Sequence, residues 1–340
     1  MKKSNFINGI FIAVLCVFVL CSAGCFQKAQ AQTRPRTQQQ PAAPVQRQAN
    51  ADDGTVSVFM TTSITPAGLM AVYRALGREP SGKVGVKIST GEPGNKHFLS
   101  PALIKDLVQH VNGTIIECNT VYGGRRASTA AHYQVAREHG FAAIAPVVIM
   151  DEKEDISIPV IGGKHLKEDF VGARFKEFDF HIVLSHFKGH QMGGLGGALK
   201  NMSIGYASSA GKAWIHSGGK SKTRPWGGAQ NDFLESMAEA AKAISDANSN
   251  KILYISIMNH LSVDCDCNGN PAAPTMADIG ILASLDPVAL DQACVDLVYA
   301  AKDGKDLIER IESRNGLLTI EHAERIGLGK RQYKLVMLDG

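Results

Sequence analysis

The segment FDFHIVLSHFKGHQMGGLGGALKN, residues 178–201, joins an apolar run directly to a group of histidines, lysines and glycines. Its first ten residues, FDFHIVLSHF, predict a buried β-strand, because the run is short, apolar and rich in β-branched and aromatic side chains. Ligands of open α/β sheets bind beyond the carboxyl ends of the strands. The segment therefore indicates both the fold class and the place of a functional site.

Outward from this segment, short apolar runs alternate with longer amphipathic ones. Further strands are expected at residues 55–60, 83–89, 113–118, 147–151, 156–161, 251–259 and 278–284. Helices are expected at residues 65–77, 100–111, 128–140, 231–248 and 286–301, and two short helices should close the chain. This alternation predicts an α/β fold with a mostly parallel sheet and flanking helices. No repeat or linker divides residues 54–340, so one domain is expected there.

The first 25 residues have the features of a secretory signal peptide. Lys2 and Lys3 form a charged start, and residues 11–20 are apolar but too short to span a bilayer. A Gly-Cys pair favours lipoprotein processing with a lipid anchor on Cys25, whereas the small residues of AQA favour cleavage after position 31. Residues 26–53 are rich in Gln, Ala, Pro and Arg and predict a disordered tether. We expect an exported protein of the periplasm or cell envelope, with a lipid anchor as its one contact with the membrane.

The composition gives no support for nucleic-acid binding. Among 340 residues, 36 Lys and Arg face 32 Asp and Glu, and no basic patch is interleaved with aromatic residues. Hydrophobic residues make up 44% of the chain, which is enough for a packed core. Many of the 34 glycines are paired, which favours loops that approach a ligand closely.

Outside the export segment the chain holds four cysteines, at positions 118, 265, 267 and 294. They form no Cys-x-x-Cys pair and no run of four ligands, so no 4Fe-4S cluster is expected. In VDCDCNGNP, residues 263–271, each of two thiols follows an aspartate in a loop after a strand. This loop indicates either a metal or redox site made by Cys265 and Cys267, or a structural, oxidised pair whose aspartates form turns.

Residues 185–217 combine three histidines with lysines and glycine pairs and contain no carboxylate. His186 and His190 are four residues apart, a spacing that suits a metal if the segment is helical. The run GGLGGALKN favours backbone N–H groups that bind an anion at the start of a helix, with Lys200 as counter-charge. The candidate cofactor-binding residues of this run are Gly193, Gly194, Gly196, Gly197, Lys200 and Asn201. Without carboxylates, these cations are expected to be neutralised by a small anion or a metal.

Several motifs together resemble the domain of unknown function 362 family: HFKGHQMGGLGGALKN, GKAWIHSG, DCDC and DIGILASLDPVALDQA. NTVYGGRRASTAAHYQVAREHGF, residues 119–141, resembles a further segment of that family. Many members carry a two-cluster ferredoxin module after the HSG motif, whereas residues 217–231 of this chain contain no cysteine. The resemblance therefore implies an uncharacterised domain without the iron–sulfur clusters of those members.

The piece from His190 to His216 also resembles the nickel-pincer lactate racemase family. In that family a lysine carries a covalently bound, nicotinic-acid-derived pincer, a later histidine binds nickel, and an earlier histidine is an acid or base. The resemblance implies these roles for Lys200, His216 and His190, respectively, with His132 as a second acid or base by its order in the chain. Nickel, or another transition metal, is the cofactor that this resemblance implies.

Two neighbouring strands are expected to bring these groups together. The strand at 178–187 leads into the histidine segment, and the strand at 251–259 leads into the DCDC loop. If the strands are parallel, Cys265 and Cys267 should line the same pocket as His190 and His216. The expected function is binding of a metal or anionic ligand, either in an enzyme acting on small anions or in a non-catalytic envelope protein. An iron–sulfur electron-transfer role is disfavoured by the missing cysteines.

Overall fold

The computed structural model describes residues 55–249 and 251–339. The expected signal peptide, both of its candidate ends and the expected tether lie outside the described residues. None of the described helices combines the length and the apolar character needed to cross a membrane.

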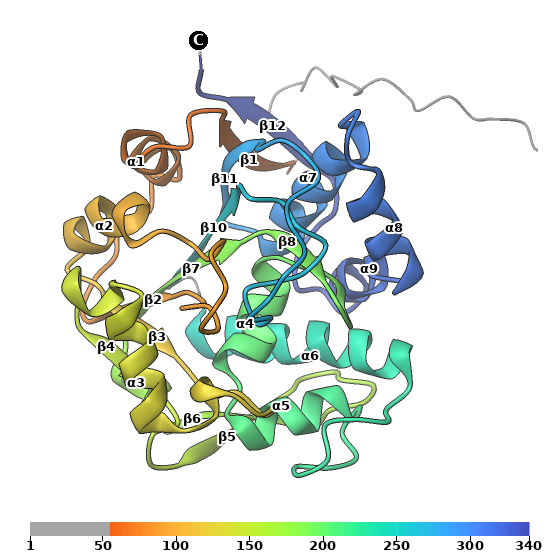
Figure 1. The fold of residues 1–340 in the computed structure, drawn as a ribbon. Helices are drawn as coiled ribbons and strands as arrows, with labels where there is room; N and C mark the ends of the chain where they lie inside the picture. Colours follow the sequence, from red (N-terminus) through yellow and green to blue (C-terminus); the bar gives the residue numbers. More distant parts are fainter. Residues whose placement is uncertain (1–54, 250, 340) are drawn as a thin grey trace, which may run out of the picture. The chain divides into compact units, whose positions relative to one another are not determined.

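Eight strands form the main sheet, in the spatial order β12-β1-β11-β10-β7-β2-β3-β4 (Figure 1). Their bounds are β1 Val56–Thr61, β2 Val84–Lys87, β3 Thr114–Glu117, β4 Val147–Ile149, β7 Phe180–His186, β10 Ile252–Met258, β11 Gly280–Ser284 and β12 Tyr333–Met337. Among these strands, β11 runs antiparallel to its neighbours β1 and β10. The other neighbouring pairs are parallel, which confirms the predicted α/β fold with a mostly parallel sheet and flanking helices.

Helices cover both faces of this sheet. Those of the described residues are α1 Pro66–Ala75, α2 Pro101–His110, α3 Thr129–Glu138, α4 Ala198–Tyr206, α5 Ser209–His216, α6 Gln230–Asn248, α7 Pro287–Ala300, α8 Lys305–Ser313 and α9 Leu317–Arg325. In Figure 1, α1 and α2 lie to one side of the sheet, and α7, α8 and α9 lie to the other. Helices α4 and α7 contact β10, and α6 packs on α4.

The central strand β7 shows why both faces are covered. Ile182 and Leu184 belong to the apolar core under α1 and α2, whereas Val183 belongs to the core under α4 and α7. Alternate side chains of a strand point to opposite faces, so an unbroken apolar run must be buried on both. The central residues 182–184 of this strand meet this condition, which is why the strand lies in the middle of the sheet.

Strands β2, β3, β7 and β10 run in the same direction, so their carboxyl ends meet at one edge. From β2 the chain moves outward to β3 and β4, and it later returns to β7 and continues on the other side to β10. Such a reversal of strand order opens a crevice at the carboxyl ends. The last residues of three strands, Lys87, Glu117 and His186, stand at this edge.

The structure contains helix α5, which was not expected, and differs from the sequence predictions in three further places. The expected strand at 156–161 is β5 (Asp155–Pro159), which pairs with β6 (Glu168–Gly172) in a separate antiparallel sheet. A hairpin of β8 (Lys188–His190) and β9 (Gly194–Gly196) stands where a glycine loop was expected. After the two closing helices comes a further strand, β12, whose half-exposed residues give only a weak apolar pattern.

Candidate functional site

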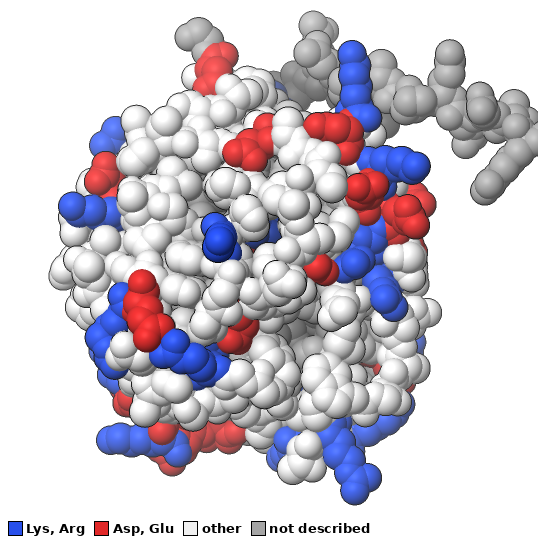
Figure 2. All heavy atoms as spheres, viewed as in Figure 1, with Lys and Arg blue, Asp and Glu red and all other residues white. Residues whose placement is uncertain are grey.

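A cavity of about 100 Å³ lies at the carboxyl edge of the sheet. Strand ends, the β8–β9 hairpin, helices α4 and α5, and the loop after β10 contribute to its lining, which includes Lys87, Glu117, His186, His190, Gly196, Gly197, Lys200, Asn201, Lys212, His216, Cys265, Asp266 and Cys267. The expectation that both loop cysteines share a pocket with His190 and His216 is therefore confirmed. On the face shown in Figure 2, charged side chains lie mainly around the margin, whereas Lys87 and Lys212 of the cavity are buried.

Three lysine side chains converge on the cavity from different elements. Lys87 ends β2, Lys200 lies in the first turn of α4, and Lys212 lies in α5. The ammonium groups of Lys87 and Lys212 donate to the backbone carbonyls of Ile88 and Ala207. Among the described residues, no group accepts a hydrogen bond from the Lys200 ammonium. Within the described part of the chain, Lys200 is thus the cavity lysine whose ammonium has no hydrogen-bond acceptor.

Burial lowers the pKa of Lys87 and of Lys200 to about 8. The charges of Arg126, Lys87 and Lys212 act on Lys200 in the same direction. Near neutral pH these amines remain mostly protonated, but they lose their protons more readily than exposed lysines do.

The two carboxylates of the lining already have partners. Glu117 stands 3.5 Å from Arg126 Nη1. Asp266 accepts hydrogen bonds from Lys188 Nζ at 2.8 Å and His186 Nδ1 at 3.0 Å. Burial opposes ionisation of both acids, but hydrogen bonds and nearby positive charges outweigh it and lower the pKa of each. Neither carboxylate forms an ion pair with Lys200 in the described residues.

His190 and His216 present opposite hydrogen-bonding groups to the cavity. Nδ1 of His190 accepts the N–H of Gly193 at 2.7 Å, so a neutral ring carries its proton on Nε2. Nδ1 of His216 lies 2.7 Å from the carbonyl of Lys212 and carries the proton itself, which leaves a lone pair on Nε2. Burial lowers the pKa of both rings, that of His216 to about 4, so both are neutral at pH 7.

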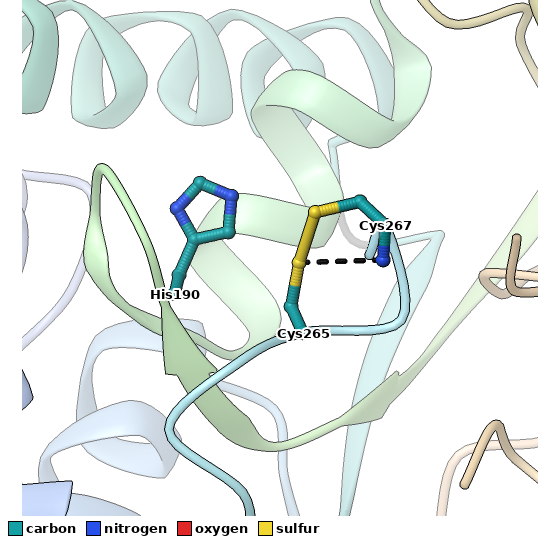
Figure 3. Close-up of side chains that lie close together, drawn as sticks. All are labelled: His190, Cys265 and Cys267. Atoms are coloured by element: carbon teal, nitrogen blue, oxygen red, sulfur yellow. Dashed lines mark hydrogen bonds between the residues drawn. A yellow bond between two sulfur atoms is a disulfide. The ribbon is translucent and has the colours of Figure 1, made fainter. Parts of the chain in front are cut away.

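Cys265 and Cys267 form a disulfide beside His190 (Figure 3). The N–H of Cys267 donates to Sγ of Cys265 at 3.4 Å. One ring nitrogen of His190 and both sulfur atoms lie within 4.8 Å of one another. Of the two alternatives expected for this loop, the structure contains the oxidised pair. The pair lies in the cavity wall rather than in the core.

His186 lines the cavity but has no free nitrogen for a metal. Its Nδ1 is 3.0 Å from a carboxylate oxygen of Asp266, and its Nε2 is 2.8 Å from the carbonyl of Asn259. Because each ring nitrogen already has a hydrogen-bond partner, neither is open to a metal. The i, i+4 spacing of His186 and His190 does not place them on one helix face, because His186 ends β7 and His190 ends β8.

His132 does not line the cavity, in contrast to the acid or base role implied for it. Its side chain is fully buried in α3, with Nε2 3.5 Å from Glu117 and Nδ1 3.4 Å from Asn119. It therefore supports Glu117 from behind and has no direct access to a ligand. Order along the chain alone could not show this, because α3 packs outside the crevice.

The glycines divide into two pairs. Gly196 and Gly197 line the cavity, whereas Gly193 lies in the hairpin turn, Gly194 begins β9, and neither lines it. Gly194 has φ +76°, and a Cβ there would lie 2.9 Å from the Cα of Gly316. The hairpin therefore requires glycine at this position for structural reasons.

The expected anion cradle at the start of α4 is occupied by the chain itself. The N–H groups of Ala198 and Leu199 donate to the carboxylate of Asp291 at 2.7 and 2.9 Å. Asn201, one turn further, donates its amide to Ser185 and to two strand carbonyls, and so fixes α4 to the sheet. These two backbone amides are consequently not free for a ligand.

Sequence reasoning missed Lys87, Arg126, Lys212, Glu117 and Asp266 as members of the site. A signal existed for Lys87, since it is a charge inside the otherwise apolar strand KVGVKIS. A buried lysine at a strand end is rare unless it has a partner or a role. No local pattern distinguishes Arg126 or Asp266 from ordinary surface charges.

Two solved structures are among those similar to this chain. The lactate racemase apoprotein from Thermoanaerobacterium thermosaccharolyticum is 16% identical with a TM-score of 0.36, and the match covers 62% of this chain and 53% of that one. A protein from Thermotoga maritima is 12% identical with a TM-score of 0.37, covering 76% of this chain and 58% of that one. The chain thus spans little more than half the length of either. No curated protein matches it. Residues 84–296 match the model of the domain of unknown function DUF362, and the chain therefore belongs to the DUF362 family.

Proposed function

We propose that the cavity binds a small anion and that Lys200 is its direct ionic partner. The charge balance of the lining carries this proposal, because four cationic side chains face two carboxylates that already have partners. The four are Lys87, Arg126, Lys200 and Lys212. An unpaired cation in a partly dehydrated site costs free energy, and a bound anion offsets that cost. The volume of about 100 Å³ restricts the ligand to a small molecule.

The proposal further assigns proton transfer to the two cavity histidines. His216 is the base, supported by its Nε2 lone pair and by a pKa of about 4 that keeps the ring neutral. His190 is the donor to negative charge that develops on the ligand, supported by the hydrogen bond that fixes its proton on Nε2. Such a pair suits enolisation or hydroxyl deprotonation of a small 2-oxo or 2-hydroxy acid.

Binding is tested by calorimetric titration of the full chain with pyruvate, lactate and inorganic phosphate. Turnover is tested by NMR detection of deuterium uptake from D₂O into the methyl group of pyruvate. Lys200→Met should lose binding, whereas Lys302→Met, which removes an exposed lysine after α7, should retain it. His216→Gln should bind the anion but lose exchange. Binding without exchange in the wild type would contradict the enzyme, and absence of binding would contradict the anion site itself.

A second candidate ligand is a transition metal or a metal-containing cofactor. Its support is His216, since a metal-binding histidine usually donates its other N–H to a carbonyl or carboxylate, as Nδ1 of His216 does. The Lys200 amine belongs to the same lining and would carry a covalently attached group. A bound metal would act as a Lewis acid toward an oxygen of the anion.

Metal analysis and intact-mass spectrometry of the wild type and Lys200→Arg test this candidate. Loss of metal or of a mass adduct in the variant would support it, because Arg cannot replace a compact, reactive amine. Equal metal content in both proteins, with no adduct on either, would remove it.

The proposal places this site in the cell envelope. Its support is the charged start, the apolar run and Cys25 of the sequence. Radiolabelled fatty acid should be incorporated into the wild type and not into Cys25→Ala if the chain is a lipoprotein. A soluble, unlabelled periplasmic form cut after position 31 would indicate ordinary processing instead, and uncleaved protein in the cytosol would contradict export.

A further inference from the structure

We propose that the Cys265–Cys267 disulfide is a redox centre of the cavity, which thiols reduce by attack on Cys267 with release of the Cys265 thiolate. This inference goes beyond anion binding and proton transfer and depends on neither. It rests on the access to the two sulfur atoms, on the donors around them and on the frame that holds their loop.

The two sulfur atoms differ in access. Cys265 is 8% exposed, whereas Cys267 is half-buried, and both line the cavity. Thiol–disulfide exchange depends on which sulfur a thiolate can reach. An incoming thiolate therefore meets Cys267 first, and the bonding electrons pass to Cys265.

Hydrogen-bond donors stand ready for negative charge on Cys265. The N–H of Cys267 already donates to Sγ of Cys265 at 3.4 Å. The His190 ring lies on the other side of the sulfur pair, with a ring nitrogen within 4.8 Å of both sulfur atoms (Figure 3). Stabilisation of the departing thiolate makes it a better leaving group and favours the reduced state.

The protonation of His190 favours thiol chemistry over metal binding by the same three residues. A metal needs a lone pair on the ring nitrogen that faces the sulfur atoms. Nδ1 of His190 accepts N–H groups from Gly193 at 2.7 Å and Met192 at 3.3 Å, so the neutral ring keeps its hydrogen on Nε2. His190 therefore offers the sulfur pair a proton donor.

The loop is anchored before and between the two cysteines. Between the cysteines, Asp266 pairs with Lys188 at 2.8 Å, and its carbonyl accepts the N–H of Glu92 at 2.9 Å. Before them, Asp264 pairs with Arg310 at 3.1 Å. These contacts keep the two thiols close when the bond opens, so the disulfide re-forms within the same molecule.

The other described cysteines do not compete. Cys118 and Cys294 are fully or almost fully buried, and the Cys118 thiol donates to the carbonyl of Tyr206 at 3.1 Å. Burial raises the pKa of Cys118 to about 12, so it remains a thiol at neutral pH.

The reaction balances with two equivalents of a thiol as the reductant. One thiolate attacks Sγ of Cys267, the Cys265–Cys267 bond breaks, and the electron pair leaves on Cys265. A second thiolate attacks the sulfur of the bound thiol in the mixed disulfide, which releases an external disulfide and the Cys267 thiolate. The external thiols lose two electrons, and the protein gains two electrons and binds two protons.

The test equilibrates the full chain in buffers of reduced and oxidised dithiothreitol, without any anionic ligand, and then alkylates free thiols with a maleimide. Peptide mass spectrometry gives the alkylated fraction of each cysteine. Cys265 and Cys267 should become labelled together with a single midpoint, while Cys118 and Cys294 remain unlabelled in the folded protein. In the single-cysteine forms, Cys267 of Cys265→Ala should react faster than Cys265 of Cys267→Ala.

Three variants isolate the role of His190. His190→Phe removes the donor and should lower the dithiol-to-disulfide ratio about tenfold at a fixed buffer potential, which is about 30 mV for a two-electron couple. His190→Gln keeps an N–H donor and should stay within about threefold of the wild type. His110→Gln, which changes an exposed histidine at the end of α2, should leave the midpoint unchanged.

Two results would overturn the proposal. One is a disulfide that stays unlabelled in excess dithiothreitol while the protein remains folded, since the pair would then be structural. The other is tight binding of one Zn²⁺ by the reduced protein, against a competing chelator, that is lost in His190→Phe. The thiols would then be metal ligands.

Discussion

Two regions of the molecule use histidine, lysine and glutamate in opposite ways. One is the cavity at the carboxyl edge of the sheet. The other, the glutamate cluster, consists of Glu235 and Glu239 of α6 with Lys164, His165 and His322. In the glutamate cluster each charged or imidazole group has a partner, whereas in the cavity the Lys200 ammonium and the His216 Nε2 have none among the described residues.

The bonding of the glutamate cluster is dense. Fully buried Glu239 accepts the backbone N–H groups of Lys164 at 2.9 Å and Leu166 at 2.8 Å, and His322 Nε2 stands 3.0 Å away. Glu235 accepts Lys164 Nζ and His165 Nε2, each at 2.6 Å. These bonds tie the turn between β5 and β6 to α6 and α9. The difference between the two regions is therefore in hydrogen-bonding and charged groups that lack a partner, and not in residue types. Such groups distinguish a binding site from a structural cluster.

The largest expected effect follows from breaking the glutamate cluster. Glu239→Leu leaves buried N–H groups and His322 without their acceptor, so the free energy of unfolding should fall by about 3–5 kcal/mol. Urea denaturation measures this value. Asp246→Asn, which breaks the exposed Lys242–Asp246 pair on the same helix, should cost at most about 1 kcal/mol. An equal decrease in the free energy of unfolding in both variants would contradict the structural role of the glutamate cluster.

The cavity should respond in the opposite way when its open cation is removed. Lys200→Met should weaken binding of a small anion about 10- to 100-fold, the range for a hydrogen bond to a charged group, and should not lower the free energy of unfolding. Because burial lowers the pKa of Lys200 to about 8, wild-type affinity should also fall as the pH rises through 8. Calorimetry between pH 6 and about 9.5, a range set by that pKa, measures both effects. A loss of stability in Lys200→Met would place this lysine with the structural groups.

Low pH should weaken the contribution of the glutamate cluster to the free energy of unfolding. Burial raises the pKa of Glu235, but bonds from His165 and Lys164 outweigh it and lower the value from 4.5 to about 2. A carboxyl with a depressed pKa contributes stability that is complete above its unfolded value and is lost as the pH falls through its folded value. The difference in unfolding free energy between wild type and Glu235→Gln should therefore shrink as the pH falls from 4.5 toward 2. A difference that is constant over this window would contradict the assignment.

A further expected effect concerns Asp291, which accepts the backbone N–H groups at the start of α4 beside the cavity. Burial raises its pKa to about 7 despite the two amides that it accepts. The folded state therefore holds this proton more tightly than the unfolded state, and the associated stability is lost as the pH rises from about 4 to 7. Asp291→Asn should remove this dependence, so the variant should gain stability relative to the wild type between about pH 5 and 8, because only the wild type must then ionise a buried carboxyl. Melting temperatures at pH 5 and 8, either side of that pKa, test this, and an unchanged pH dependence would refute it.

Local patterns in the sequence were sufficient to predict the alternation of strands and helices. They also predicted that the histidine segment after β7 and the DCDC loop after β10 lie close together. The short apolar runs and the Pro-opened helices are properties of neighbouring residues, and parallel strands must end at a common edge. The motif of His190, Lys200 and His216 indicated the cavity because it directly follows a strand that ends at this edge.

Pairings between distant segments could not be found in this way. The amides at the start of α4 appeared free because their acceptor, Asp291, comes from α7. His186 appeared to be a ligand because its partner Asp266 lies in another loop. Which polar groups lack a partner depends on such long-range contacts. A single sequence shows no periodic pattern from which these contacts could be predicted.

The pairing of β1 has a consequence for the order of folding. The first described strand pairs with β11 and β12, with Val58 opposite Ser284 and Val56 opposite Tyr333. Strands β2, β3, β4, β7 and β10 find their neighbours within the intervening chain. Contacts of such long sequence separation carry a large loop-closure entropy and slow folding. A chain still emerging from the ribosome can assemble the crevice half of the sheet, while β1 remains unpaired until β11 is synthesised and keeps one edge unpaired until β12 follows.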